Sequence, residues 1–261
     1  MKTVSDAVDI AKRAGVEIMK IYQTDFEVDT KADASPVTQA DRVADALIVQ
    51  AIKDEITADY PIVSEESFEE GKTQVDEDAP FWLVDPLDGT KQFVAKRGEF
   101  TVNIALIEAG RPVLGVVHAP ALNVTYWGSR NGAFLRIGDQ EKTAISVRPK
   151  PDGGIAAVVS RSHKTPETDD FMKHFTVTEE VSCGSSIKFC RIAEGAADLY
   201  PRLGRTMEWD TAAGHAVLMY AGGIVLREGA VPMGYGKPGF ENPHFFACSE
   251  ALSDDVAAVI S

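Results

Sequence analysis

The segment WLVDPLDGTKQF, residues 82–93, places two aspartates three positions apart on either side of a Pro-Leu turn. Its apolar start, residues 82–84, predicts a buried strand that ends at Asp85. Asp88 follows so closely that the two carboxylates would repel each other unless a positive charge lay between them. The rest of the chain must therefore supply or bind that charge.

Two interpretations of this segment are open. Carboxylate oxygens are the ligands that Mg²⁺ prefers, and Gly89-Thr90 begins a turn whose free backbone N–H groups can bind a phosphate. A carboxylate pair beside such an anion site indicates metal-bridged phosphate chemistry. In the other interpretation, Asp88 only caps the short helix that follows.

Two further acidic residues bear on this choice. Glu65 follows the short apolar strand 62–63 and can enter the same site from a neighbouring strand end, although the acidic stretch 69–78 equally fits a solvated loop. Asp210 precedes the small and apolar residues TAAGHAVLMYAGG, where N-capping of a helix explains it without any metal. Neither residue decides the question alone.

Composition limits the classes of protein. The 261 residues, 44% of them apolar, can form one large domain or two fused lobes. A formal net charge of −14 repels nucleic-acid polymers and argues against DNA or RNA as a partner. The chain has no apolar run of about 18 residues and no apolar signal segment at its start, so neither a membrane span nor secretion is expected. Three cysteines without a zinc-binding spacing fit a reducing cytoplasm.

The hydrophobic pattern predicts alternating layers of helix and sheet. Amphipathic helices are expected at 3–22 and 39–58, the second capped by Thr38 with Asp41 three residues later. Strands are expected at 62–64, 81–85, 100–107, 113–118, 124–127, 133–137, 155–160, 176–181, 198–202 and 224–226. Further helices are expected at 167–174, from 185 onward, and at 211–221. We predict an α+β or α/β layered sandwich with an N-terminal lobe, 1–150, and a C-terminal lobe, 151–261, joined without a flexible linker.

Three separated motifs carry a family resemblance. The segment WLVDPLDGTKQF fits the signature D-P-x-D-G-T, EWDTAAGHAVL fits W-D-x-A-A-G, and Glu65 lies twenty residues before Asp85. Together they resemble the inositol monophosphatase superfamily of Mg²⁺-dependent, lithium-sensitive phosphatases, over residues 31–214. The resemblance implies an inositol monophosphatase/fructose-1,6-bisphosphatase-like fold.

Within that superfamily, the chain is most similar to the 3′(2′),5′-bisphosphate nucleotidases of the bacterial CysQ type. The segments that carry this similarity are 98–120, 160–163, 184–202 and 208–217. The resemblance implies hydrolysis of the 3′-phosphate of adenosine 3′,5′-bisphosphate (PAP) to AMP, in support of sulfate assimilation. It also implies a cytoplasmic protein, with peripheral association at the inner membrane as a variant, and leaves the oligomeric state undetermined.

The resemblance assigns the metal ligands. One Mg²⁺ would be held by Glu65, Asp85 and the backbone carbonyl of Leu87, and a second by Asp85, Asp88 and Asp210. Four carboxylates then balance two divalent cations, which explains why the acids can crowd. A third, weaker Mg²⁺ is also seen in the family.

The resemblance likewise assigns the residues around the water and the phosphate. Thr90 and Asp41 would orient the attacking water, with Glu65 as the third catalytic residue. The phosphate would lie on the N–H groups of Gly89 and Thr90, between the metal ligands.

The substrate is expected to be a small phosphorylated nucleotide, and its remaining binding residues come from the second half of the chain. The complete set that the resemblance implies is Leu87, Asp88, Gly89, Thr90, His163, Ser185, Lys188, Arg202 and Asp210. Other interpretations remain open: Lys188 as an exposed helix lysine, Arg202 as an ion-pair partner of Asp198 or Glu194, and His163 as a solvated loop residue.

Other functions remain to be weighed. The metal motifs alone do not separate a nucleotidase from an inositol mono- or bisphosphate phosphatase or another sugar phosphatase. A non-catalytic metal-binding protein would not require Thr90 beside all four carboxylates. A glycosidase with paired carboxylates would explain neither Gly89-Thr90 nor the number of acids.

Overall fold

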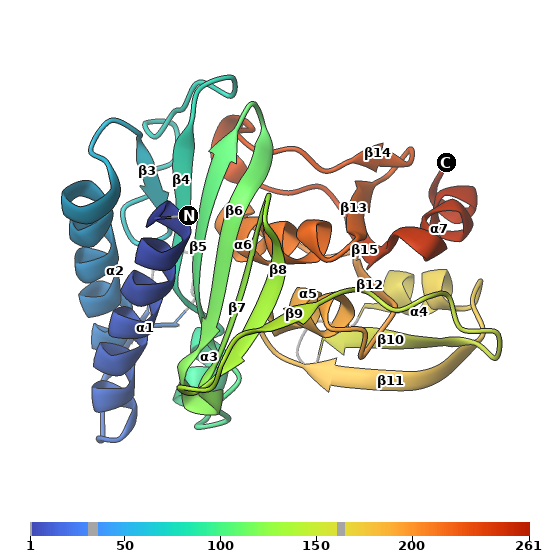
Figure 1. The fold of residues 1–261 in the computed structure, drawn as a ribbon, viewed down its shortest axis with the longest axis horizontal. Helices are drawn as coiled ribbons and strands as arrows, with labels where there is room; N and C mark the ends of the chain where they lie inside the picture. The colour runs from blue at the N-terminus through green and yellow to red at the C-terminus, as the bar shows by residue number, and fades with distance from the viewer. Residues whose placement is uncertain (1, 31–35, 161–164) are drawn as a thin grey trace.

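A computed structural model describes residues 2–30, 36–160 and 165–261 of the chain. Helices and sheets alternate in layers (Figure 1). The helices α1 (Lys2–Tyr22) and α2 (Gln39–Ala51) cover one face of the first sheet, and α5 (Ile187–Ala193) and α6 (Glu208–Tyr220) lie between the two sheets. The helices α4 (Pro166–Met172) and α7 (Ser253–Ile260) lie on the far side of the second sheet. The predicted layered sandwich is confirmed.

The first sheet has seven strands in the order β3-β4-β5-β6-β7-β8-β9. Its first pair, β3 and β4, is parallel, and each later pair is antiparallel. The strands are β3 (Ile62–Ser64), β4 (Phe81–Asp88), β5 (Thr101–Glu108), β6 (Arg111–Ala119), β7 (Val124–Ser129), β8 (Gly132–Ile137) and β9 (Thr143–Ile145). A further antiparallel pair, β1 (Val28–Thr30) and β2 (Pro36–Thr38), lies apart from it.

The second sheet has six strands in the order β11-β10-β12-β15-β13-β14. The strands are β10 (Ile155–Ser160), β11 (Val177–Cys183), β12 (Leu199–Arg202), β13 (Gly223–Arg227), β14 (Val231–Pro232) and β15 (Phe245–Ser249). The first sheet therefore uses residues 62–145 and the second uses 155–249, while α6 from the second half of the chain packs against the first sheet. The division into lobes at residue 150 stays a prediction.

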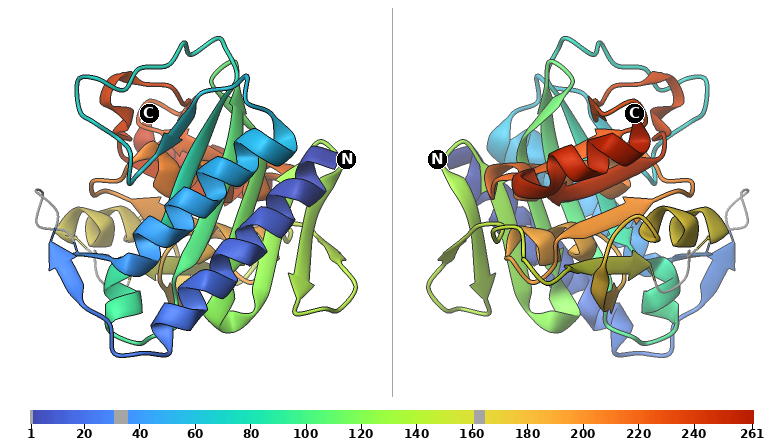
Figure 2. Two further views of the ribbon diagram at one scale, coloured as in Figure 1. Left: turned by 90° about the vertical axis from the view of Figure 1, so that its left-hand side faces the viewer. Right: turned by 90° about the vertical axis from the view of Figure 1, so that its right-hand side faces the viewer.

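The first two helices form as the periodicity predicts. Their buried faces form one apolar cluster with the outer face of the first sheet, and Figure 2 shows the two helices side by side across that sheet. Thr38 is the N-cap of α2, and its backbone N–H donates to the side chain of Asp41 at 2.7 Å. The helix was predicted to continue to 58, but its α-helical part ends at Ala51 and a wider π-helical turn, Ile52–Ile56, follows.

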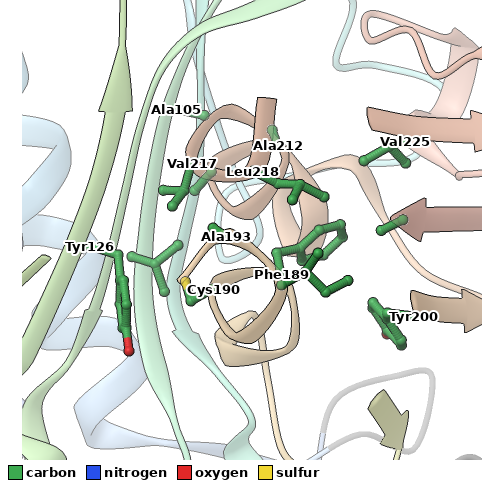
Figure 3. Close-up of a cluster of buried hydrophobic side chains, with 14 of the residues drawn as sticks. Ala105, Tyr126, Phe189, Cys190, Ala193, Tyr200, Ala212, Val217, Leu218 and Val225 are labelled. Carbon is green, nitrogen blue, oxygen red and sulfur yellow. The ribbon is translucent and has the colours of Figure 1, made fainter. Parts of the chain in front are cut away.

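The helix α6 lies close to the first sheet because two strand positions have no side chain. A Cβ on Gly115 would overlap the carbonyl oxygen of Ala213, and one on Gly128 would lie 2.6 Å from the carbonyl oxygen of Ala216. Small residues on the helix complete the contact, and Figure 3 shows Ala212, Val217 and Leu218 of α6 beside side chains of α5 and both sheets. The start of α6 is thereby fixed relative to the first sheet.

Most predicted elements are confirmed to within a few residues, and the misses are short or C-terminal. The pattern missed β1, β2, β9, β14, β15 and α7, whereas the short helix expected after Asp88 is present as the five-residue helix α3 (Thr90–Val94). Two of the missed elements, β9 and β14, are short strands at sheet edges, which bury too few alternating residues to give a periodic signal.

Candidate active site

The motif of residues 82–93 is shaped by a bulge in β4. The strand was predicted to end at Asp85 but continues through Asp88. Asp85 pairs with Asn103 and Asp88 pairs with Thr101, so β4 holds one residue more than β5 over this interval. Residues three apart on a regular strand point to opposite faces, and one inserted residue returns the second to the face of the first. The bulge therefore places both aspartates on the same face of the sheet.

Three carboxylates meet at this face. Glu65 follows β3, where its N–H bonds to the carbonyl of Val84 on β4. One carboxylate oxygen from each of Glu65, Asp85 and Asp210 lies within 4.8 Å of the others. Asp85 is 1% exposed, and the other two are partly buried. The parallel β3–β4 pair and the start of α6 thus bring together acids that lie 145 positions apart in the chain.

Asp210 is not the N-cap that the sequence predicted. It is the third residue of α6, and it accepts the backbone N–H of Met207, the residue before the helix, at 2.8 Å. Burial, followed by the nearby charges of Asp88 and Glu65, raises the pKa of Asp210 to about 8. Buried carboxylates that repel one another, with hard oxygen donors only, fit a divalent cation such as Mg²⁺. A bound metal ion would relieve the repulsion between these carboxylates.

Asp88 is held apart from that group of three. Its Oδ2 accepts the backbone N–H of Ser186 at 2.6 Å and lies 2.9 Å from the Ser186 hydroxyl. The Oδ1 atom makes no hydrogen bond with the described residues. Asp88 therefore has one anchored oxygen and one that is available to a cation.

Thr90 and Asp41 contact each other, as the family resemblance implies. The Thr90 hydroxyl lies 3.2 Å from Asp41 Oδ1 and also 3.2 Å from the carbonyl oxygen of Leu87. The other oxygen of Asp41 accepts the N–H and the hydroxyl of Thr38, each at 2.7 Å. Asp41 is thus both the capping-box residue of α2 and the partner of Thr90, from two different carboxylate oxygens.

The turn between β4 and α3 requires glycine. Gly89 has a φ of 93°, in the left-handed region. A Cβ at this position would also lie 3.0 Å from the carbonyl oxygen of Glu99. Glycine therefore lets the backbone turn directly from Asp88 to Thr90.

A cavity of about 560 Å³ joins these residues to the second half of the chain. Most of the positions that the sequence singled out line it: Glu65, Asp85, Leu87, Asp88, Gly89, Thr90, Ser185, Lys188, Arg202 and Asp210. Aromatic side chains complete the wall: Phe68, Phe189, Tyr200 and Trp209. Of the other predicted residues, Asp41 reaches the cavity through Thr90, and His163 lies outside the described residues.

Lys188 is a buried cation in this wall, and the alternative of an exposed helix lysine is wrong. It is 8% exposed, donates to the carbonyl oxygen of Ser185 at 2.6 Å, and lies 5.4 Å above the ring of Tyr200. Burial lowers the pKa of Lys188, while the charge of Asp88 opposes that shift. Ser185 itself has a φ of 48°, in the left-handed region that non-glycine residues rarely adopt.

Arg202 is also buried, and the ion pairs suggested for it from the sequence are wrong. Asp198 binds Arg148 through two hydrogen bonds of 2.7 and 2.5 Å, and Glu194 binds Arg191 at 2.6 Å. The Nε atom of Arg202 has no hydrogen-bond partner in the described part of the chain. Among the described residues, then, neither buried cation of the cavity forms an ion pair.

Comparisons with known proteins identify the family of this chain. The model of the inositol monophosphatase family matches residues 1–240. The chain belongs to the inositol monophosphatase family. It is 42% identical over 240 residues to the 3′(2′),5′-bisphosphate nucleotidase CysQ of Escherichia coli K12, covering 90% of this chain and 95% of that protein.

Solved structures of the inositol monophosphatase family share the fold. The crystal structure of CysQ from Bacteroides thetaiotaomicron, 38% identical, superposes with a TM-score of 0.80 over 95% of this chain and 97% of that one. An inositol monophosphatase of Thermotoga maritima, 26% identical, gives 0.79 over 100% and 97%.

Sequence reasoning missed two polar residues at the site of this family member. Ser186 and Asn103 bond to each other and to Asp88, but neither stands in a motif that names a chemical role. The only local signal is the second serine of GSSIKF, next to the predicted Ser185.

In the described parts of the chain, residues 2–30, 36–160 and 165–261, we find no helix with the length and apolar character needed to cross a membrane.

Proposed function

We propose that the chain is a Mg²⁺-dependent 3′(2′),5′-bisphosphate nucleotidase, which hydrolyses the 3′-phosphate of PAP to give AMP and phosphate. The observation that carries this proposal is the pairing, in one cavity, of an acidic cluster with two buried cations. The cluster of Glu65, Asp85 and Asp210 suits metal ions, while Lys188 and Arg202 suit a second anionic group. A bisphosphate supplies an anion for each.

The four carboxylates would hold two Mg²⁺ ions. Glu65, Asp85 and the carbonyl of Leu87 would hold one, and Asp85, Asp88 and Asp210 the other. When bound, these ions supply an activated water and stabilise charge on the attacking and leaving oxygens. Because Oδ2 of Asp88 is held by Ser186, its Oδ1 would be the atom that binds the metal.

Thr90 and Asp41 would orient the attacking water. A hydroxyl has one proton, and an ionised carboxylate accepts it in preference to a peptide carbonyl, so Thr90 donates to Asp41 rather than to Leu87. The Thr90 oxygen can then accept a hydrogen bond from the water. The neighbouring Glu65 would act as the proton acceptor.

The buried cations would select the substrate. A lysine and an arginine that are shielded from water attract a phosphate strongly, because the dielectric around them is low. The second phosphate of the nucleotide would lie against them and hold the ribose 3′-phosphate at the acidic cluster. An inositol monophosphate has no anionic group for this part of the cavity.

The net charge of the chain also favours a small-molecule substrate over a polymer. The chain as a whole carries −14 and repels polyanions, and the cavity would become a local exception once Mg²⁺ ions neutralise its carboxylates. The three cysteines of the chain are buried, which is in keeping with the proposed cytoplasmic location.

Phosphate release tests the proposal. We would measure it from PAP, inositol 1-phosphate and fructose 1,6-bisphosphate with Mg²⁺, then with added Li⁺. The expected result is fastest turnover of PAP, abolished without Mg²⁺ and inhibited by Li⁺. Equal or faster turnover of inositol 1-phosphate would instead assign the chain to the inositol phosphatases of its family.

A further inference from the structure

One hydroxyl group lies between the acids of the first half of the chain and those of the second. Ser186, buried just before α5, donates its backbone N–H to Asp88 Oδ2 at 2.6 Å, and its Oγ lies 2.9 Å from the same oxygen. The same Oγ lies 2.8 Å from the backbone carbonyl oxygen of Asp210. A single residue therefore contacts two of the three residues that the proposed function assigns to the second Mg²⁺.

The donor count decides where the Ser186 proton goes. A serine hydroxyl has one proton and two lone pairs. Asn103 Nδ2 donates to Oγ at 2.7 Å and lies 3.5 Å from Asp88 Oδ2. This orientation of the amide is favoured, because the reversed one would place the amide oxygen against the carboxylate of Asp88. With one lone pair taken by Asn103, the hydroxyl proton goes to the better of its two acceptors, which is the ionised carboxylate of Asp88.

The remaining contacts of Asp88 Oδ2 are long. The hydroxyl of Thr101 lies at 3.4 Å and Asn103 Nδ2 at 3.5 Å, near the limit at which a hydrogen bond still contributes. The two short bonds both come from Ser186. Its backbone N–H remains when the residue is replaced by alanine, whereas the hydroxyl is removed.

We propose that Ser186 is a positioning residue for Mg²⁺ binding. Its hydroxyl, oriented by Asn103, fixes the Asp88 carboxylate in the orientation that leaves Oδ1 for the metal. This inference rests on the proposed function. Its physical basis is that a carboxylate already held in one orientation need not be ordered when the metal binds.

Calorimetric titration of Mg²⁺ into the metal-free full chain tests this role. Groups that orient a metal ligand are worth about 10–100-fold in affinity, and because the N–H of Ser186 remains, we expect Ser186→Ala to weaken binding about tenfold. The matched control is Ser249→Ala, since Ser249 is also buried but its hydroxyl forms no hydrogen bond with any described residue. That control should leave the Mg²⁺ affinity unchanged. The melting temperature without metal separates loss of affinity from loss of fold.

The variant Asn103→Ala keeps the test decisive if Ser186→Ala does not fold. It removes the donor that orients the hydroxyl, together with a 3.5 Å contact to Asp88 Oδ2 that is too long to contribute much. We expect about threefold weaker Mg²⁺ binding, the loss of a modest hydrogen bond. The double variant should bind no more weakly than Ser186→Ala, because Asn103 acts through Ser186. Additive losses would overturn this arrangement.

The outcomes separate the two proposals. If the wild-type chain binds no Mg²⁺, the proposed function is wrong. If the wild type binds Mg²⁺ and folded Ser186→Ala binds it equally well, the positioning role is wrong and the proposed function stands.

Discussion

The close contact between α6 and the first sheet should set the position of Asp210, and Gly115→Ala tests this. A Cβ on Gly115 would overlap the carbonyl oxygen of Ala213 and lie 2.6 Å from the Cβ of Ala216, where 3.4 Å is an ordinary contact. The helix would have to move by at least about 0.8 Å, because interiors are packed too densely to absorb the overlap. Ala213 is one helical turn from Asp210, so the carboxylate would move with it.

Two effects follow from that shift. Overpacking costs about 1–3 kcal/mol of unfolding free energy, which corresponds to a melting temperature lower by roughly 2–4 °C per kcal/mol. A displacement approaching 1 Å at a catalytic centre lowers the rate by up to about 100-fold. We therefore expect Gly115→Ala to fold, to melt several degrees lower, and to lose Mg²⁺ affinity and kcat together.

The assay combines thermal unfolding, Mg²⁺ titration and PAP turnover. The control is Gly153→Ala, because a Cβ there meets no atom within 4 Å. It should change the free energy of unfolding by no more than about 0.5 kcal/mol and leave activity intact. If Gly115→Ala melts lower yet binds Mg²⁺ and turns over PAP like the wild type, the contact does not position Asp210 and this reasoning fails.

Three further predictions follow from the site and the core. Asp88→Asn should fold but lose activity by more than about 100-fold, since its single amide oxygen meets the Ser186 donors and its NH₂ faces the metal; retained turnover with intact metal binding would contradict the two-metal arrangement. Lys188→Ala should raise the KM for PAP by about 10–100-fold, the worth of a charged hydrogen bond, with a smaller effect on a simple monophosphate; a uniform loss on both substrates would indicate a structural role. Burial lowers the pKa of His215 to about 3, below its ordinary 6.5, so the fold holds it neutral. Its contribution to stability is complete above pH 6.5 and is lost as the pH falls toward 3, by about 1.4 kcal/mol per pH unit. Chemical denaturation at pH 5 and 7.5 should show a shallower pH dependence in His215→Asn than in the wild type, and equal slopes would refute this assignment.

Where the structure departs from the sequence prediction, the cause is nonlocal. The end of the strand at Asp85 was a reasonable prediction, because proline and glycine follow it. The strand continues because β5 accepts the extra residue as a bulge. Lys188 was open to interpretation as an exposed residue because a seven-residue helix gives too little periodicity to show which face is buried.

The sequence by itself determined the features that depend on near neighbours. These features arise from interactions over a few residues. They are the amphipathic helices, the capping box of Thr38 and Asp41, and the succession of strands along the chain. The three motifs also identified the family, since each is contiguous.

Only the tertiary structure decided how these parts combine. Asp85 and Asp88 share a face because of pairing with β5, and Ser186 meets Asp88 across 98 positions of the chain. Asp210 reaches Glu65 and Asp85 because glycines of the first sheet admit a helix of the second half. The motifs identify the acidic residues. Which of them lie close together, and which cations are buried beside them, depends on distances in space. For residues far apart in the chain, only packing fixes those distances.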